Sequence, residues 1–298
     1  MPPPFPRVTI IVPTYHWSAV LPFSIGSALD QSFADFELIV VGDGCSDDSA
    51  EVVAAIGDPR VRWVNLPSNS GHQSAPNNEG LRQARGALIA YLGHDDLWLP
   101  HHLQCLVEPI EAGADMAFGL TQMVPAATEP GPWIVGGPYQ RNGWLPPTSV
   151  VHRRALAERC GGWRDHRGLS VDPEVELWTR FHDAGAKIHP VSRLTAVKLP
   201  AALRRGVYRE RPSHEQAAWL ARIRAEPDFE PAELARMLLA ATQRPFGALL
   251  GEMLSRAGMR ARGAWRRATG RPRPGEQVER RRRDKGLVAA GSTPGAME

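Results

Sequence analysis

The chain has 298 residues, of which 43% are hydrophobic and 22% charged, a composition that excludes wholesale disorder and allows a sizeable core. No stretch approaches about 20 consecutive apolar residues, so we expect no transmembrane helix, and three widely spaced cysteines without a CxxC pair favour a reducing, cytoplasmic location. The net charge of +3 is uneven: residues 250–285, with 12 basic and four acidic residues, carry +8, residues 286–298 carry −1, and residues 1–249 carry −4.

The first hundred residues alternate between short apolar runs and helical patterns. The apolar runs predict strands at 8–12, 36–41, 61–65 and 87–92. Helical patterns lie between them at 17–29, in a segment that follows Asp47-Asp48-Ser49 and ends at Ala55, and at 78–85. A further helix begins near Pro100. Strands that are apolar throughout and alternate with helices predict a right-handed parallel α/β sheet.

The middle of the chain is less regular. A strand is expected at 114–121, and the Pro- and Gly-rich segment Pro125–Pro147 predicts a long functional loop or an excursion at the edge of the sheet. The remaining patterns predict strands at 149–152 and 187–191 and helices at 154–161 and 174–184.

Helical patterns dominate the C-terminal part, at 213–225, 231–242 and 246–269. We expect a domain over 1–205, a helical basic appendage over 206–269 and a disordered basic tail over 270–298. The 246–269 helix mixes apolar residues with arginines, so it either makes a peripheral contact with the inner face of a membrane or packs on the domain. No nucleic-acid-binding motif accompanies the Arg280–Arg283 run, so no nucleic-acid partner is expected.

Polar residues follow three of the predicted strands, at the carboxyl ends where open α/β sheets bind ligands. They are Pro13-Thr14-Tyr15, Asp43 and His94-Asp95-Asp96. Two adjacent carboxylates repel each other unless a cation neutralises them. Mg²⁺ or Mn²⁺ binds such oxygens and keeps positions open for phosphate. The alternative is a solvated loop in which Asp96 caps the next helix.

Several motifs occur in one order over roughly residues 7–110, namely Val8–Tyr15, Gln31–Phe33, Phe36–Asp47, Asn69–Gly71, Asn78–Gly80, Ala84–Gly86 and Tyr91–Pro100. Together they resemble a family 2 glycosyltransferase of the GT-A fold. A looser match through Gly161–Trp163 to Glu174–Trp178 extends the resemblance to about residue 200. The resemblance implies a GT-A-like α/β fold whose mostly parallel sheet is flanked by helices.

The resemblance also implies an activity. It is the metal-dependent, inverting transfer of a sugar from a UDP-, GDP- or dTDP-linked donor to a saccharide, lipid-linked or other small acceptor, as in the synthesis of cell-envelope polysaccharides. Asp96 would ligate Mg²⁺ or Mn²⁺ on the donor diphosphate, and Asp95 would face the ribose or a metal-bound water. The resemblance assigns donor binding to Pro13, Thr14, Tyr15, Asp43, Asn69, Gly71, Asn78, His94 and Asp95.

Inverting transfer needs a base near the acceptor hydroxyl. The resemblance places it in the segment Asp172–Trp178, with Glu174 as the first candidate and Asp172 as the second. The alternative is a helix N-terminus enriched in acids because of the helix dipole. Trp133 and Trp144 precede this segment, and such rings either stack on sugars or pack in the core.

Three departures from the family pattern leave the donor open: Pro76-Asn77-Asn78 replaces an Arg-Asn pair, Gly93 replaces an acid, and His16 replaces an Asn. A Rossmann dehydrogenase is excluded because the first predicted strand-to-helix turn, Val12–Trp17, contains no glycine. Two alternatives remain, a catalytically inactive nucleotide-sugar-binding module of the same fold and a metal-dependent phosphohydrolase.

Overall fold

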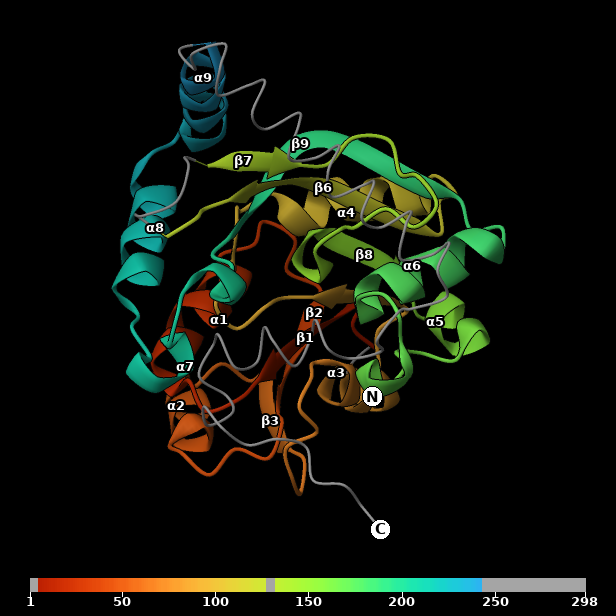
Figure 1. Cartoon of the computed structure of the whole chain (residues 1–298), viewed down its shortest axis with the longest axis vertical. Coiled ribbons are helices and arrows are strands. Elements are labelled where there is room, and N and C mark those ends of the chain that lie inside the picture. Colours follow the sequence, from red (N-terminus) through yellow and green to blue (C-terminus); the bar gives the residue numbers. More distant parts are fainter. Residues whose placement is uncertain (1–4, 127–131, 243–298) are drawn as a thin grey trace.

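The structure is a computed structural model that describes residues 5–126 and 132–242 (Figure 1). The predicted 246–269 helix and the 270–298 tail lie outside these residues. Within the described ranges, every helix is too short or too polar to cross a membrane.

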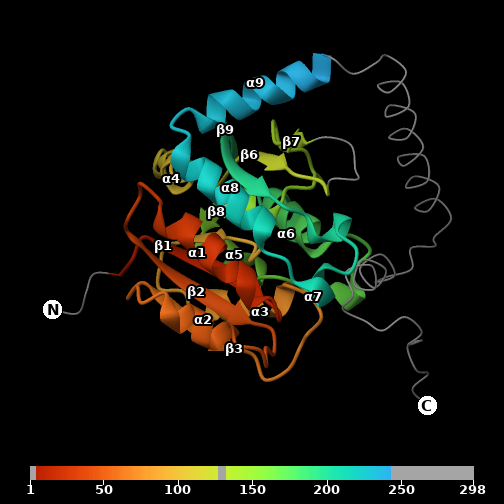
Figure 2. The same ribbon diagram turned by 90° about the vertical axis from the view of Figure 1, so that its left-hand side faces the viewer.

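A mixed sheet of nine strands forms the centre of the described part (Figures 1 and 2). Its order is β3-β2-β1-β4-β8-β6-β9-β5, and β7 pairs with β6. The strands are β1 Val8–Thr14, β2 Phe36–Gly42, β3 Val61–Asn65, β4 Leu88–Tyr91, β5 Leu97–Trp98, β6 Met116–Met123, β7 Trp133–Val135, β8 Val150–Arg153 and β9 Ile188–Lys198.

The direction of the strands confirms a mostly parallel sheet. β1 runs parallel to both β2 and β4, β3 is parallel to β2, and β9 is parallel to β6. β8 is antiparallel to both of its neighbours, β4 and β6, so it joins two parallel groups that point the same way. The carboxyl ends of these groups therefore meet along one edge of the sheet.

Helices cover both faces of the sheet. Successive residues of a strand point to opposite faces, which is why β1 is apolar throughout: Ile10 and Val12 join one core cluster and Ile11 the other, all three fully buried. One cluster packs against α1 Leu21–Leu29, α2 Ser49–Ala55 and α4 His102–Glu111. The other packs against α3 Ser74–Gln83, α5 Arg154–Cys160 and α6 Pro173–Asp183.

The chain after residue 205 contains α7 Val207–Glu210, α8 His214–Ala225 and α9 Phe229–Thr242. Leu220 and Ile223 of α8 share a core cluster with Leu97 of β5 and Leu194 of β9. α8 also contacts α1, on the face turned to the viewer in Figure 2. The first long helix of the expected appendage is therefore packed on the α/β body.

Three elements differ from the sequence-based expectation. The strand expected at 187–191 continues to Lys198 with register shifts opposite Gly119–Thr121, because it pairs along the whole of β6. β7 lies inside the expected loop and pairs with the end of β6. The helix expected at 78–85 begins earlier, at Ser74.

Candidate active site

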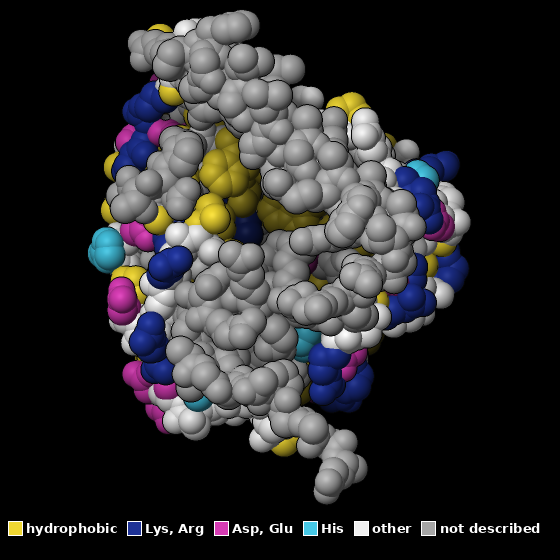
Figure 3. All heavy atoms as spheres, in the orientation of Figure 1, with side chains coloured by type: hydrophobic (Ala, Val, Ile, Leu, Met, Phe, Trp, Pro, Cys, Tyr) yellow, Lys and Arg dark blue, Asp and Glu magenta, His cyan; other side chains and the backbone are white. Residues whose placement is uncertain are grey.

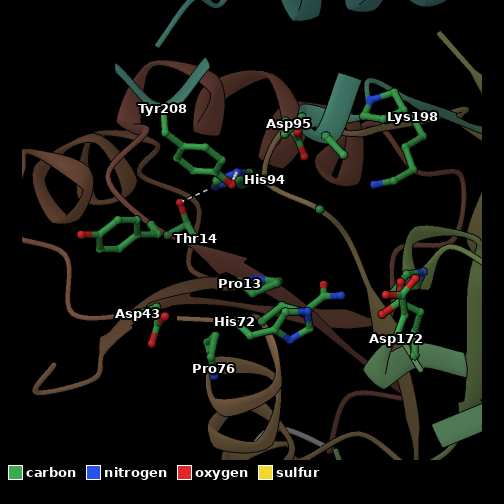
Figure 4. Close-up of a pocket in the computed structure, with 18 of the residues that line it drawn as sticks. Pro13, Thr14, Asp43, His72, Pro76, His94, Asp95, Asp172, Lys198 and Tyr208 are labelled. Atoms are coloured by element: carbon green, nitrogen blue, oxygen red, sulfur yellow. Dashed lines mark hydrogen bonds between the residues drawn. The ribbon is translucent and has the colours of Figure 1, made fainter. Parts of the chain in front are cut away.

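A cavity of about 600 Å³ lies at the carboxyl ends of β1 and β2 and beside the turn after β4 (Figure 4). Figure 3 shows hydrophobic side chains of the described residues near the centre of this face of the molecule. The cavity brings together most of the predicted site residues, which are Pro13, Thr14, Tyr15, Asp43, Asn69, Gly71, His94, Asp95, Asp172 and Glu174. Two predicted residues, Asn78 and Asp96, are not among those that line it.

Asp43 organises the loop on one side of the cavity. Its side chain follows β2, and its two carboxylate oxygens accept hydrogen bonds from the backbone N–H groups of Ser70 (2.9 Å) and Gly71 (3.2 Å). Asn69 donates to the backbone carbonyl of Asp43 at 3.3 Å. Gly71 has a φ of +89°, which a residue with a side chain rarely adopts. Two predicted segments thus form one structural unit, and each Asp43 oxygen keeps a lone pair for a ligand.

His94 connects the end of β1 to α7. Its Nδ1 lies 2.8 Å from Thr14 Oγ1 and its Nε2 lies 3.2 Å from the Tyr208 hydroxyl (Figure 4). Trp17 makes edge-to-face ring contacts with both His94 and Tyr208. Burial raises the pKa of Tyr208 well above its usual range, so its hydroxyl stays protonated. His94 therefore holds the segment around α7 against the cavity.

The two adjacent carboxylates have different surroundings. Asp95 lines the cavity, whereas Asp96 is fully buried. Asp96 Oδ2 accepts a hydrogen bond from Lys198 Nζ at 2.8 Å, and Oδ1 accepts one from the backbone N–H of Leu199 at 3.2 Å. Burial raises the pKa of Asp96, and the Lys198 ammonium opposes that effect. Burial alone lowers the pKa of Lys198, but Asp96, Asp95 and Glu174 outweigh it, and the net pKa is raised.

Of the two carboxylates in this turn, Asp95 is the one that faces the cavity. A Cβ at Gly93 would lie 2.4 Å from Asp96 Oδ2, so glycine is what allows the Asp96 carboxylate to pack against this turn. Within residues 5–126 and 132–242, His, Cys, Asp and Glu side chains form no group of three or more that could hold a metal by themselves. Mg²⁺ needs only one or two carboxylates when substrate phosphates supply other ligands. Asp95 meets that requirement, while Asp96 is already engaged by Lys198.

The acidic segment at the start of α6 forms another side of the cavity. Asp172 is the N-cap residue of α6, and its side chain makes no capping hydrogen bond. Glu174 is 7% exposed and accepts a hydrogen bond from the Trp144 indole N–H at 2.9 Å. Glu176 points elsewhere, toward Arg164 and Arg180 at 2.8 Å each. The structure therefore brings both predicted bases, but not Glu176, to the cavity.

Asn78 has a structural position instead of a place in the cavity. Its Nδ2 donates to the Trp163 carbonyl and its Oδ1 accepts from the Trp163 N–H, each at 2.8 Å. These bonds tie α3 to the segment before α6.

Several residues that line the cavity were not predicted from the sequence, among them Lys198, Tyr208, His72, Gln73 and Met123. One signal was present for Lys198, because only three of the 35 basic residues are lysines, and this one ends an apolar run. The other four residues are not part of a recognisable motif, so no local sequence pattern indicated that they would line the cavity.

Known proteins resemble both the sequence and the fold. The family model described as Glycosyl transferase family 2 matches residues 9–153. The succinoglycan biosynthesis protein ExoO of Rhizobium meliloti is 40% identical over 113 residues, which cover 38% of this chain and 32% of ExoO. The GalNAc(5)-diNAcBac-PP-undecaprenol beta-1,3-glucosyltransferase of Campylobacter jejuni is 34% identical over 119 residues, 38% of each chain. The matches with these two relatives thus span only about a third of their length.

Solved structures confirm the GT-A-like fold. S. aureus TarS 1-349 in complex with UDP-GlcNAc superposes with a TM-score of 0.55 at 18% identity, covering 76% of this chain and 69% of that chain. The mannosyltransferase PcManGT from Pyrobaculum calidifontis, in complex with GDP-Man and Mn²⁺, has a TM-score of 0.54 at 17% identity and covers 96% and 87%. At these identities the likeness concerns the fold alone.

Proposed function

We propose, from the premise that residues 9–153 belong to glycosyl transferase family 2, that this chain transfers a sugar from a nucleotide-diphosphate sugar to a saccharide or lipid-linked acceptor. The observation that carries the proposal is one cavity shared by Asp43, Asp95 and Glu174, which come from three separate parts of the chain. The names of the Campylobacter relative and of the E. coli relative WfgD specify diphosphoundecaprenol-linked substrates, which supports a lipid-linked acceptor and a role in cell-envelope polysaccharides.

The donor is proposed to lie across the sheet edge. Tyr15, Asp43 and the 69–71 loop would hold the nucleoside, since these groups surround the end of the cavity near β1 and β2. The diphosphate would lie toward Asp95 and Lys198, because the lysine is the cation that reaches the cavity wall from β9 (Figure 4). The solved complexes of TarS and PcManGT make UDP- and GDP-sugars the first donors to test.

Metal dependence is part of the proposal. We propose that Asp95 is the direct protein ligand of Mg²⁺ or Mn²⁺. Asp96, which is hydrogen-bonded to Lys198, would hold the turn that carries Asp95 in place. When bound, such an ion supplies Lewis-acid stabilisation of the departing diphosphate. The Lys198 ammonium lies on the same side, and its N–H groups that are not bonded to Asp96 would donate hydrogen bonds to the diphosphate oxygens.

Glu174 is proposed as the general base. It takes the proton of the acceptor hydroxyl as that oxygen forms a bond to the anomeric carbon. The bond from the anomeric carbon to the diphosphate oxygen breaks at the same time, and the diphosphate leaves with the electron pair, which inverts the anomeric centre. Asp172 lines the same wall of the cavity and is the second candidate.

A thermal-shift screen with UDP, GDP and dTDP, with and without Mn²⁺, tests donor binding. A nucleotide at 100 times its Kd should stabilise the protein by about 2.7 kcal/mol. Glu174→Gln should keep this stabilisation and lose transfer, while Glu158→Gln, an exposed carboxylate on α5, serves as the control. Release of inorganic phosphate from a nucleoside diphosphate without an acceptor would indicate a phosphohydrolase. Binding without turnover in the wild type, whatever the acceptor, would indicate an inactive binding module.

A further inference from the structure

The loop before β8 is tied to the helix that carries Glu174. Arg141 makes a two-pronged ion pair with Asp183 at the end of α6, at 2.8 and 2.7 Å. Further along the loop, the backbone carbonyl of Leu145 accepts a hydrogen bond from the Trp178 indole at 3.1 Å. These two attachments bracket Trp144. The position of Trp144 relative to α6 is therefore set before any substrate binds.

Trp144 uses only one edge of its ring for this contact. Its indole N–H donates to Glu174 Oε1 at 2.9 Å, yet the residue remains 36% exposed and lines the cavity. Trp163 and Trp178, by contrast, are buried in the core. Packing thus accounts for those two rings and leaves the exposed surface of Trp144 unexplained.

Trp133 reaches the same cavity from another element. It lies in β7, is 38% exposed, and pairs with Met123 of β6, which in turn pairs with Lys198 of β9. These three residues line the cavity and stand in one row across adjacent strands. Two strand spacings separate Trp133 from Lys198, about 10 Å. Trp133 therefore lines the cavity one strand beyond Met123, on the side where the diphosphate end of the donor is proposed to lie.

We propose that Trp133 and Trp144 form the acceptor subsite, where their exposed rings take the apolar C–H face of a pyranose, and that Trp144 also positions Glu174. This inference rests on the proposed function. The C–H face of a sugar is apolar and suits the electron-rich face of indole. A hydrogen bond from the indole N–H favours the ionised carboxylate and restricts its rotamers, so Glu174 is held ready to accept a proton. The other charged groups near this carboxylate are the Lys198 ammonium of β9, which also favours its ionised form, and Asp172 at the start of α6, which opposes it. Figure 4 places Asp43 at one side of the cavity and both Lys198 and Asp172 at the other, so the reacting end of the donor would meet the acceptor beside Glu174.

Two variants separate the two roles. Trp144→Phe keeps an aromatic face and removes the N–H donor. Trp133→Ala removes a ring and leaves the Trp144–Glu174 bond intact. The donors are UDP-glucose, UDP-GlcNAc and GDP-mannose with Mn²⁺. The acceptors are p-nitrophenyl glycosides of glucose, galactose, mannose and N-acetylglucosamine. Slow hydrolysis of the donor, in which water is the acceptor, reports on Glu174 without the acceptor subsite.

We expect Trp144→Phe to raise the apparent pKa on the acidic limb of the hydrolysis profile by about one pH unit, because the ionised carboxylate loses a charge-assisted hydrogen bond. Its acceptor KM should change less than threefold. Trp133→Ala should leave the pH profile in place and raise the acceptor KM about tenfold, the factor that covering roughly 60 Å² of apolar ring supplies. A merely structural role for Trp144 would not move the pH profile.

An unchanged profile in Trp144→Phe would overturn the positioning role. An unchanged acceptor KM in Trp133→Ala, or failure of every glycoside to bind the wild type, would overturn the subsite. Each of these results is compatible with a wild type that binds a nucleotide and turns it over. The proposed function fails on a different observation, the absence of nucleotide-induced stabilisation in the wild type.

Discussion

Replacing Lys198 by methionine should destabilise the protein strongly, because it leaves Asp96 buried without its counter-charge. Asp96 is fully buried and Lys198 is 20% exposed, so water cannot replace the ammonium without a rearrangement. Removing one member of a buried ion pair costs about 3–5 kcal/mol. The Leu199 N–H still bonds Asp96 Oδ1, so we expect the lower end, about 3 kcal/mol at pH 8.

The loss should depend on pH. Burial raises the pKa of folded Asp96 to about 6, above its unfolded value of 3.8, so the folded state binds more protons than the unfolded state between these values. This carboxyl group therefore makes stability fall as the pH rises through that window. Without Lys198 the pKa of folded Asp96 rises further, so more of the loss of unfolding free energy appears above pH 6. Lys198→Met should therefore be less destabilising at pH 5 than at pH 8.

Denaturant unfolding at pH 8 and pH 5 measures both effects, and the double variant Asp96→Asn with Lys198→Met provides the control. Asparagine keeps an oxygen for the Leu199 N–H and carries no charge, so the double variant should recover most of the loss. A loss below 1 kcal/mol at pH 8, or strict additivity of the two substitutions, would refute the account of Asp96 as a charge held by Lys198.

Three further variants test other parts of the structure. Gly93→Ala should reduce nucleotide-induced stabilisation, because its Cβ would collide with Asp96 Oδ2; unchanged thermal shifts would contradict this. Asn78→Ala should lower the unfolding free energy by about 2 kcal/mol in denaturant melts while nucleotide affinity stays the same, since it loses two bonds to Trp163 outside the cavity. Burial lowers the pKa of His102 to about 3, so stability is lost as the pH falls below about 6.5. His102→Phe should therefore reduce this acid sensitivity by up to about 1.4 kcal/mol per pH unit, and parallel pH profiles would rule it out.

The N-terminal half could be predicted because its signals are local. Apolar runs such as Val8–Val12 indicate buried strands, and alternation with helices indicates a parallel sheet whose carboxyl ends share one edge. That rule alone places Asp43 and Asp95 near each other, and the cavity confirms that they line one space. Glu174 was predicted from the family resemblance of the segment Asp172–Trp178, and it lines the same cavity.

The second half depended on pairings that no local pattern encodes. β8 runs antiparallel between β4 and β6, and β9 continues along β6 for seven residues beyond its predicted end. That continuation brings Lys198 to Asp96, 102 positions earlier in the chain. How far a strand extends depends on the strand with which it pairs, and the local sequence does not show which strand that is.

The sequence by itself thus determined the fold class, the edge of the sheet at which the chemistry lies and the acidic residues that lie there. Only the tertiary structure decided which of two adjacent aspartates faces the cavity and which is buried against a lysine, and which tryptophans stay exposed beside Glu174. The physical reason is that the hydrophobic period and the succession of strands and helices along the chain depend on residues that are neighbours in the sequence. The surroundings of a side chain in a turn or loop are set by distant segments that pack against it.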